Sequence, residues 1–192
     1  MSNKTFPEKK RLTKHYILPG DTLADELRRR IIRVDHAGEY GAVRIYEGQL
    51  AILGNSPAKS AIQEMAEHEE KHLKVFEELL KNTRTRPTAL LPIWHSAGFL
   101  LGAATALMGE KAAMACTSAI EEVIEEHYEK QSQSLGDDDA ELRDTIEEFR
   151  EEEAAHRDTA INLGAKEASA YKTLSTAIKK GSRLAIWLSE RI

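Results

Sequence analysis

One arrangement of glutamates and histidines occurs twice in this chain of 192 residues, and it constrains the fold more than any other feature. In each copy a single glutamate precedes a Glu-x-x-His pair, by 30 residues in the first copy and by 32 in the second. The first copy consists of Glu39, Glu69 and His72, and the second of Glu121, Glu153 and His156. Residues three apart lie on the same face of an α-helix, so each pair projects from one side of a helix. The repetition therefore predicts two similar helical halves.

The rest of the chain also follows a helical pattern. Apolar residues recur at intervals of three and four, and aromatic residues make up only 6% of the chain, which leaves little material for strands. We predict an all-α fold, in which Asp21 or Thr22 caps the first helix and Ser56 the second. One of the glycines between 98 and 109 is expected to break the third helical region. The predicted helices cover about 21–53, 57–81, 87–135, 140–163 and 167–191.

The repeated glutamates and histidines also indicate the architecture. Glu69 and His72 share a helix face with the apolar residue Phe76, so they point into the bundle. A ferritin-like di-iron bundle takes one glutamate from each of two helices and a Glu-x-x-His pair from each of the other two. We therefore predict one ferritin-like four-helix domain over 21–192, with an added C-terminal helix. An irregular basic arm is expected over 1–20.

The chemistry of the predicted ligands favours a metal site. A buried carboxylate is costly unless it has a partner, and a metal ion is the strongest partner available. Four carboxylates and two imidazoles suit iron or manganese, and four negative charges balance two divalent ions. The Glu of each Glu-x-x-His pair, Glu69 or Glu153, is expected to bridge the two ions. Helical phase alone leaves open whether Glu121 or Glu122 is the ligand on the third helix.

Four further residues are predicted to line the metal site or to lie behind its ligands. Asp35 lies one turn before the first lone glutamate and could accept a hydrogen bond from a ligand histidine. For His36, a position behind the ligands or a packing role is expected. Tyr128 either lines the site or makes a simple buried hydrogen bond. Glu125 is either a spare carboxylate near the ions or a surface residue.

Several stretches of the sequence resemble the demethoxyubiquinone hydroxylase family, over about residues 28–192. They are RRIIRVDHAGEYGA, EHEEKHLKVFEELL, RPTALLPIWHSAGFLLGAATALMGEKAAMACTSAIEE, EEFREEEAAHRD and RLAIWLSERI. The resemblance implies the same six iron ligands and selects Glu121 over Glu122. It also implies a monooxygenase of ubiquinone biosynthesis that hydroxylates the demethoxyubiquinone ring, using O2 and reducing equivalents from NADH. No Gly-x-Gly-x-x-Gly dinucleotide motif is present.

The segment from Pro87 to Gly109 contains no charged residue. Its length would allow a membrane span, which needs roughly 20 apolar residues, but its prolines, glycines and His95 make a poor one. We predict a helix lying in the membrane interface, with ordinary bundle core as the alternative. The residues expected to meet the membrane or line a substrate channel are Trp94, Phe99, Leu100 and Leu101.

These features predict the partners and the location. The implied partners are a ubiquinone-precursor lipid, a membrane surface, and a homo-oligomer or a ubiquinone-biosynthesis complex. The net charge of −5 argues against binding to nucleic acid. We expect a peripheral membrane protein on the cytoplasmic face of a bacterial inner membrane, or on the matrix side of the mitochondrial inner membrane.

Two other functions are compatible with the same fold. A ferritin-like iron oxidase or peroxidase would use the same ligands, but iron storage needs a polar entry path, and the apolar segment does not provide one. A non-enzymatic lipid-binding partner would have no need for six buried polar ligands.

Overall fold

Residues 24–192, the part of the chain that this computed structural model describes, form six α-helices and no strand. The predicted arm over 1–20 and the predicted start of the first helix lie outside these residues. The all-α prediction is confirmed. The helices are α1 Ala24–Leu53, α2 Lys59–Thr83, α3 Leu91–Leu107, α4 Glu110–Ser134, α5 Ala140–Asn162 and α6 Tyr171–Ser189, with short 3-10 turns at Asp137–Asp139 and Ala165–Glu167.

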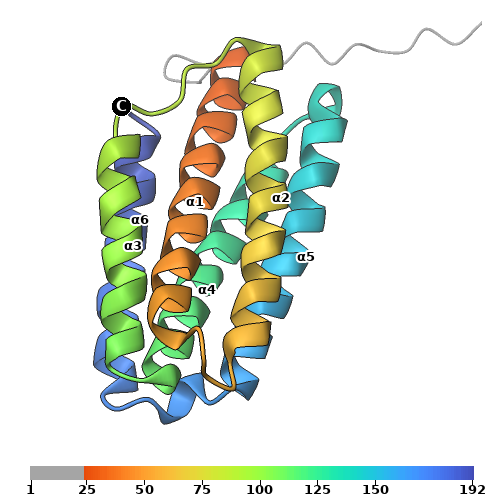
Figure 1. The fold of residues 1–192 in the computed structure, drawn as a ribbon. Coiled ribbons are helices and arrows are strands. Elements are labelled where there is room, and N and C mark those ends of the chain that lie inside the picture. The colour runs from red at the N-terminus through yellow and green to blue at the C-terminus, as the bar shows by residue number, and fades with distance from the viewer. Residues whose placement is uncertain (1–23) are drawn as a thin grey trace, which may run out of the picture.

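Four of the helices, α1, α2, α4 and α5, form the bundle that carries the predicted ligands, and the other two flank it (Figure 1). α3 packs on α1, and α6 packs on α4. The segment over 84–90 crosses the end of the bundle, so α3 runs in the same direction as α1, and α6 likewise runs parallel to α4 (Figure 1). The order α1–α2–α3 is thus repeated by α4–α5–α6.

α3 and α6 lie beside each other at one end. The indole N–H of Trp94 in α3 donates a hydrogen bond to the Ser189 hydroxyl of α6, 3.0 Å away, and the backbone N–H of Ala89 donates to the carbonyl of Ile192. The apolar segment predicted from sequence is therefore α3, and the added C-terminal helix is its partner in a second layer.

The predicted break in the third helical region is confirmed: Gly109 adopts a positive φ of 111° that reverses the chain between α3 and α4. Two other predicted boundaries differ from the structure. Ser56 caps no helix, since it lies in a turn whose backbone N–H bonds to Leu53, and α2 begins two residues later than predicted. The last helix begins at Tyr171, after the 3-10 turn.

Glycines allow α1 and α3 to approach closely. A Cβ on Gly102 of α3 would overlap the carbonyl oxygen of Ile45 in α1, and a Cβ on Gly48 of α1 would overlap the carbonyl oxygen of Phe99. In both cases the obstructing atom belongs to the backbone, which cannot rotate away. The two helices are thus held at a distance that only glycine permits.

Two apolar clusters fill the bundle above and below its middle. One contains Ile32, Phe76 and Ile146, and the other contains Ile62 and Met114, all fully buried. In α2 and α5 the predicted ligands fall between residues of the two clusters. The polar centre is therefore enclosed by apolar packing from both ends.

The Gly102→Ala substitution is expected to lower the free energy of unfolding by about 1–3 kcal/mol, because the new methyl group forces α1 and α3 apart. Urea unfolding followed by circular dichroism measures the change. Gly181→Ala is the matched control: its Cβ would meet no atom within 4 Å, so this change should be neutral or stabilising. Equal stability of Gly102→Ala and the parent protein would contradict the packing argument.

Candidate metal centre

The six predicted ligands come together in the middle of the bundle. Each is buried, with at most 4% of its surface exposed. Their donor atoms form two groups, within each of which one atom from every member lies within 4.8 Å of the others. The first group is Glu39, Glu69, His72 and Glu153, and the second is Glu69, Glu121, Glu153 and His156.

Glu69 and Glu153 belong to both groups and lie between the two histidines. His72 Nδ1 is 3.2 Å from Glu153 Oε1 and 3.5 Å from Glu39 Oε2. His156 Nδ1 is 3.1 Å from Glu69 Oε1 and 3.4 Å from Glu153 Oε2. Each group thus has one histidine and one glutamate of its own, and the two shared carboxylates are placed to bridge two ions.

The donor atoms of the centre are not satisfied by the protein. Both carboxylate oxygens of Glu69 and of Glu153 are buried without a hydrogen bond, as is Nδ1 of each histidine. One oxygen each of Glu39 and Glu121 is in the same condition. Because buried polar atoms normally have partners, this concentration of unsatisfied donor atoms fits a metal-binding site. Two divalent ions fit the number, the charge and the type of these donors.

The protonation of the centre reflects the same excess of negative charge. Burial, reinforced by the neighbouring carboxylates, raises the pKa of Glu69 and of Glu121 well above the usual range. At Glu153 burial acts in the same direction, but the close imidazoles of His156 and His72 outweigh it and lower the pKa to about 2. Burial opposes a charge on His72, yet Glu153 and Glu39 raise its pKa to about 11. A proton on His72 thus offsets part of the negative charge of the centre.

Two buried tyrosines hold the glutamates that belong to one group only. Tyr46 of α1 donates a hydrogen bond of 2.6 Å to Glu121 of α4, and Tyr128 of α4 donates one to Glu39 of α1. Burial and the adjacent carboxylates raise the pKa of both tyrosines, so both remain protonated donors. Tyr128 thus makes a buried hydrogen bond, and its partner is a predicted ligand.

The outer nitrogen of each ligand histidine also has a partner. His72 Nε2 lies 2.5 Å from Glu152 Oε2, and His156 Nε2 lies 3.1 Å from Nδ1 of His68. These contacts fix the ring orientation and leave Nδ1 of each histidine facing the centre. Asp35, which the sequence suggested for this role, bonds neither histidine; its carboxylate accepts a hydrogen bond of 2.7 Å from Gln131.

Two other predicted neighbours belong to neither group of predicted ligands. His36 is buried, its Nδ1 has no hydrogen-bond partner, and its ring stacks on Tyr40. Burial lowers the pKa of His36 and favours the neutral ring. Glu125 forms an ion pair with Arg157 of α5 and belongs to neither ligand group. Glu125 is therefore not a spare carboxylate of the centre, which was one of its two predicted roles.

An apolar groove of about 240 Å³ lies between α1, α3, α4 and α6. Of the four residues predicted for a membrane contact or substrate channel, Trp94 and Leu101 line this groove. Phe99 and Leu100 do not: Phe99 packs under the Arg44 guanidinium, and Leu100 is 65% exposed. The wall contains no charged side chain and is made of Val34, Ala37, Gly38, Gly41, Ala42, Ile45, Trp94, Ala97, Gly98, Leu101, Ile120, Ile124, Gly181, Ser182, Ala185, Ile186 and Ser189.

Comparison with known proteins confirms the family resemblance. Residues 26–189 match the family model of the ubiquinone biosynthesis protein COQ7. The chain belongs to the COQ7 family. It is 55% identical over 176 residues to the 3-demethoxyubiquinol 3-hydroxylase of Rhodospirillum rubrum, a match that covers 91% of this chain and 83% of the relative.

Eukaryotic COQ7 relatives are also similar. The human protein, named NADPH-dependent 3-demethoxyubiquinone 3-hydroxylase, mitochondrial, is 50% identical over 167 residues, covering 85% of this chain and 77% of the relative. The 5-demethoxyubiquinone hydroxylase, mitochondrial, of Saccharomyces cerevisiae is 38% identical over 180 residues, again with 85% and 77% covered.

Sequence reasoning missed several residues around the centre of this COQ7 chain, although a repeated signal marks some of them. Each lone glutamate is followed by a tyrosine seven residues later and a glutamine ten residues later. Gln131 bonds Asp35, and in the equivalent place Gln49 donates to Thr117, 3.2 Å away. Two residue types recurring at the same offsets would have identified the tyrosines and glutamines together.

Metal binding should strengthen with rising pH. At neutral pH the raised pKa of His72 keeps a proton on its ring in the metal-free protein, and the upward pKa shifts of Glu69 and Glu121 favour their protonated forms. An incoming ion must displace these protons, so each one released changes affinity by roughly tenfold per pH unit. Calorimetric titration with Co²⁺ in buffers of different ionisation enthalpy measures the release. An affinity that does not change between mildly acidic and mildly alkaline pH would contradict this account.

Changing either shared carboxylate should reduce the iron content. Glu69→Ala or Glu153→Ala removes a donor common to both groups, so each variant should bind at most one ion per chain instead of two. Iron analysis after anaerobic loading gives the stoichiometry. Glu70→Ala is the matched control, because Glu70 is exposed on the same helix and pairs only with Lys74. Two ions in Glu69→Ala would refute a bridging role.

Proposed function

We propose that this chain is a di-iron monooxygenase that hydroxylates the ring of demethoxyubiquinone. The observation that carries the proposal is a buried centre of four glutamates and two histidines beside an uncharged groove. The R. rubrum, human and yeast relatives are all named as hydroxylases of demethoxyubiquinol or demethoxyubiquinone, which supports the same substrate here.

In this proposal the six ligands would hold two iron ions, which supply the O2 chemistry when bound. The chain's own residues prepare the site for that chemistry. Glu69 and Glu153 would bridge the ions, while the phenols of Tyr46 and Tyr128 hold Glu121 and Glu39 in place. The apolar clusters on both sides exclude bulk water, so reducing equivalents are directed to the substrate. One oxygen atom enters the ring and the other leaves as water, with two electrons and two protons.

The groove is the proposed entrance for the quinone. Its wall offers small and apolar side chains, which suit an isoprenoid chain and an aromatic ring. Gly38 and Ile120 line it, and each directly precedes a glutamate of the centre, Glu39 or Glu121. A Cβ on Gly38 would meet no atom within 4 Å, so this glycine leaves open space on the groove side of α1.

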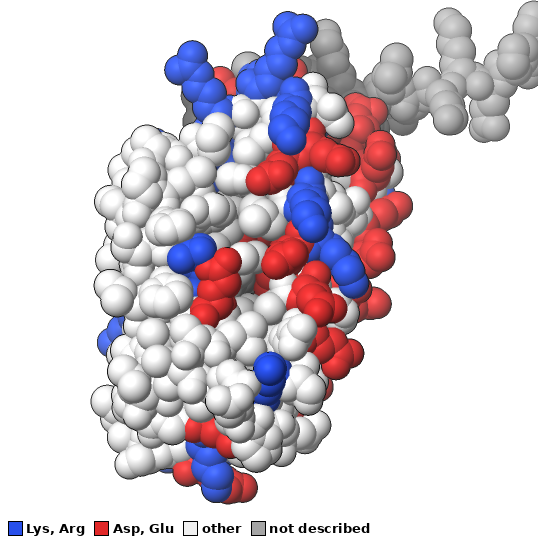
Figure 2. Space-filling view, viewed as in Figure 1, with Lys and Arg blue, Asp and Glu red and all other residues white. Residues whose placement is uncertain are grey.

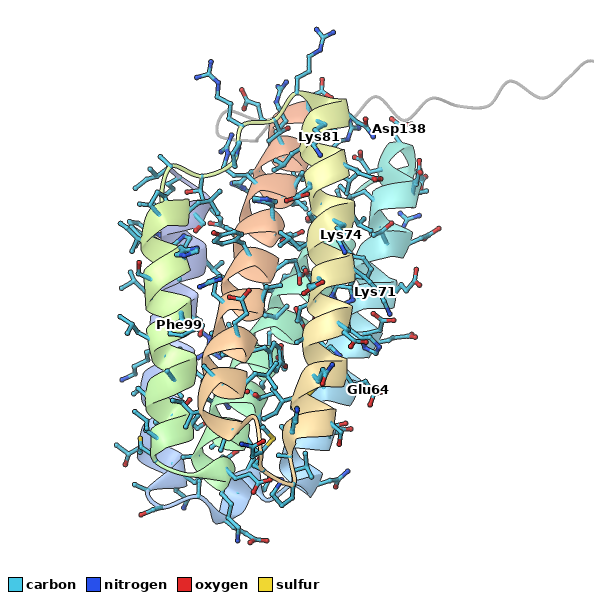
Figure 3. The ribbon with its side chains drawn as sticks, viewed as in Figure 1. Glu64, Lys71, Lys74, Lys81, Phe99 and Asp138 are labelled. Atoms are coloured by element: carbon cyan, nitrogen blue, oxygen red, sulfur yellow. The ribbon has the colours of Figure 1, made fainter. Side chains whose placement is uncertain are left out.

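We propose that the outer surface of α3 and α6 rests on a membrane. Figure 2 shows charged side chains gathered over α2 and α5, while the face over α3 is nearly free of them. The exposed residues of α2 in Figure 3 include Glu64, Lys71 and Lys74. By contrast, most of the large exposed apolar residues belong to α3, α6 or the positions just after them: Ile93, Leu100, Leu107, Met108, Leu184, Trp187 and Ile192.

Among the described residues, no helix combines the length and the apolar character that crossing a membrane would require. An interfacial position suits the arrangement of α3 and α6, because the apolar side chains lie on one outer layer. The human and yeast relatives are named as mitochondrial. For this chain we propose peripheral binding, on the cytoplasmic face of a bacterial membrane or the matrix side of the mitochondrial one.

The electron source is a separate part of the proposal. The sequence-based expectation is NADH, whereas the name of the human relative specifies NADPH. A nicotinamide donor is common to both, and the choice between them is left to the assay.

The decisive assay combines iron-loaded protein, demethoxyubiquinone, isotopically labelled O2 and either NADH or NADPH. We expect the quinone product to gain one labelled oxygen atom, detected by mass spectrometry. The Glu153→Ala variant serves as the inactive control. Oxidation of free Fe²⁺ with no change in the quinone would favour the iron oxidase, and iron-free protein that binds the quinone unchanged would favour a lipid-binding role.

Membrane binding is tested by flotation with vesicles of phosphatidylcholine and phosphatidylglycerol. A variant with Ile93, Leu100 and Leu107 changed to Ser should lose most of its flotation, because it removes exposed apolar area from α3. The control changes Ile52 and Leu163 to Ser, two exposed apolar residues outside α3 and α6. Equal flotation of the α3 variant and the parent would disprove this orientation.

A further inference from the structure

The two halves of the centre are built from equivalent residues that contact one another across antiparallel helices. Tyr46 donates a hydrogen bond to Glu121, and Tyr128 donates the corresponding hydrogen bond to Glu39. The residue immediately before each Glu-x-x-His pair likewise reaches the ligand histidine of the opposite pair. In this last position, however, the chemistry differs, because one half has His68 and the other has Glu152.

The difference lies directly behind the ligands. His72 Nε2 is 2.5 Å from a carboxylate oxygen of Glu152, so this nitrogen must carry the proton and donate it. His156 Nε2 is 3.1 Å from a ring nitrogen of His68, an acceptor without negative charge. A carboxylate behind a ligand histidine withdraws the proton more strongly, and so makes the nitrogen facing the metal a better donor.

We propose that the two metal positions are unequal, and that the position of His72 and Glu39 binds its ion more tightly because Glu152 backs His72 where His68 backs His156. Glu152 and His68 are thus positioning residues, which act on the ions through the ligand histidines. The first ion to bind occupies the His72 position, and the His156 position holds the ion that is lost first.

This inference rests on the proposed two-ion centre. It requires no particular substrate, so metal binding alone can test it. The remaining donors would be nearly identical, since each position has one glutamate of its own and shares Glu69 and Glu153. An inequality between the positions should therefore respond to the residue behind each histidine.

The test uses full-length variants that retain one position each. His156→Ala leaves the His72 position, and His72→Ala leaves the His156 position. Affinity for Co²⁺ is measured by competition with a chromogenic chelator. We expect His156→Ala to bind at least about tenfold more tightly than His72→Ala, since loss of such an outer partner costs roughly 10- to 100-fold in affinity.

Adding Glu152→Gln supplies the matched control. In the His156→Ala background it should weaken Co²⁺ binding by roughly 10- to 100-fold. In the His72→Ala background the histidine that Glu152 contacts is absent, so the affinity for Co²⁺ should not change. Equal affinities of the two single variants, or an equal effect of Glu152→Gln in both backgrounds, would overturn the proposal. No metal binding by the parent protein would refute the di-iron function itself.

A second measurement avoids the ligand variants in case they do not fold. The parent protein is loaded anaerobically with one equivalent of Mössbauer-active Fe²⁺. One dominant quadrupole doublet in the parent protein, which is no longer dominant in Glu152→Gln, supports unequal sites. Two doublets of equal area in the parent protein would overturn the proposal, even though the two-ion function would stand.

Discussion

The structure depends on one electrostatic constraint, which is that four carboxylates share the buried middle of a single bundle. Each is costly to bury alone, and together they repel one another. Three kinds of group offset this: protons or cations in the centre, the imidazoles of His72 and His156, and the phenols of Tyr46 and Tyr128. Each of the four ligand-carrying helices contributes to this compensation, so their relative positions are fixed by the centre as well as by apolar packing.

A repeated arrangement of helices explains how one chain satisfies the constraint. The three-helix units α1–α2–α3 and α4–α5–α6 place equivalent helices opposite each other, with α1 against α4 and α2 against α5 (Figure 1). Because these pairs are antiparallel, a contact made in one direction recurs in the other. Tyr46 of the first unit bonds Glu121 of the second, and Tyr128 of the second bonds Glu39 of the first. In the same way Gln49 bonds Thr117, and Gln131 bonds Asp35. α3 and α6 then occupy matching positions, and the groove forms between them.

Spacing along one helix was sufficient for the helices and for five of the six buried donors, and the family resemblance selected Glu121 over Glu122. It was insufficient where the partner comes from another helix. Glu125 shares a helix face with Glu121, yet Arg157 of α5 pairs with it. Asp35 was expected to support a ligand histidine, but Glu152 and His68 occupy those places. Which neighbouring helix meets a given face depends on bundle topology, and no periodicity within one segment contains that information.

The topology also relates the groove to the centre. α1 and α4 each present one face to the ions and another to the groove, so Glu39 and Gly38, or Glu121 and Ile120, are adjacent in the chain but serve different surroundings. The groove therefore lies beside the buried glutamates and histidines, while α2 and α5 carry the charged side chains seen in Figure 2. Small side chains on α1 are what allow this approach. Enlarging Gly38 would fill the groove without touching a ligand, so access and metal binding are separable properties of the same helix.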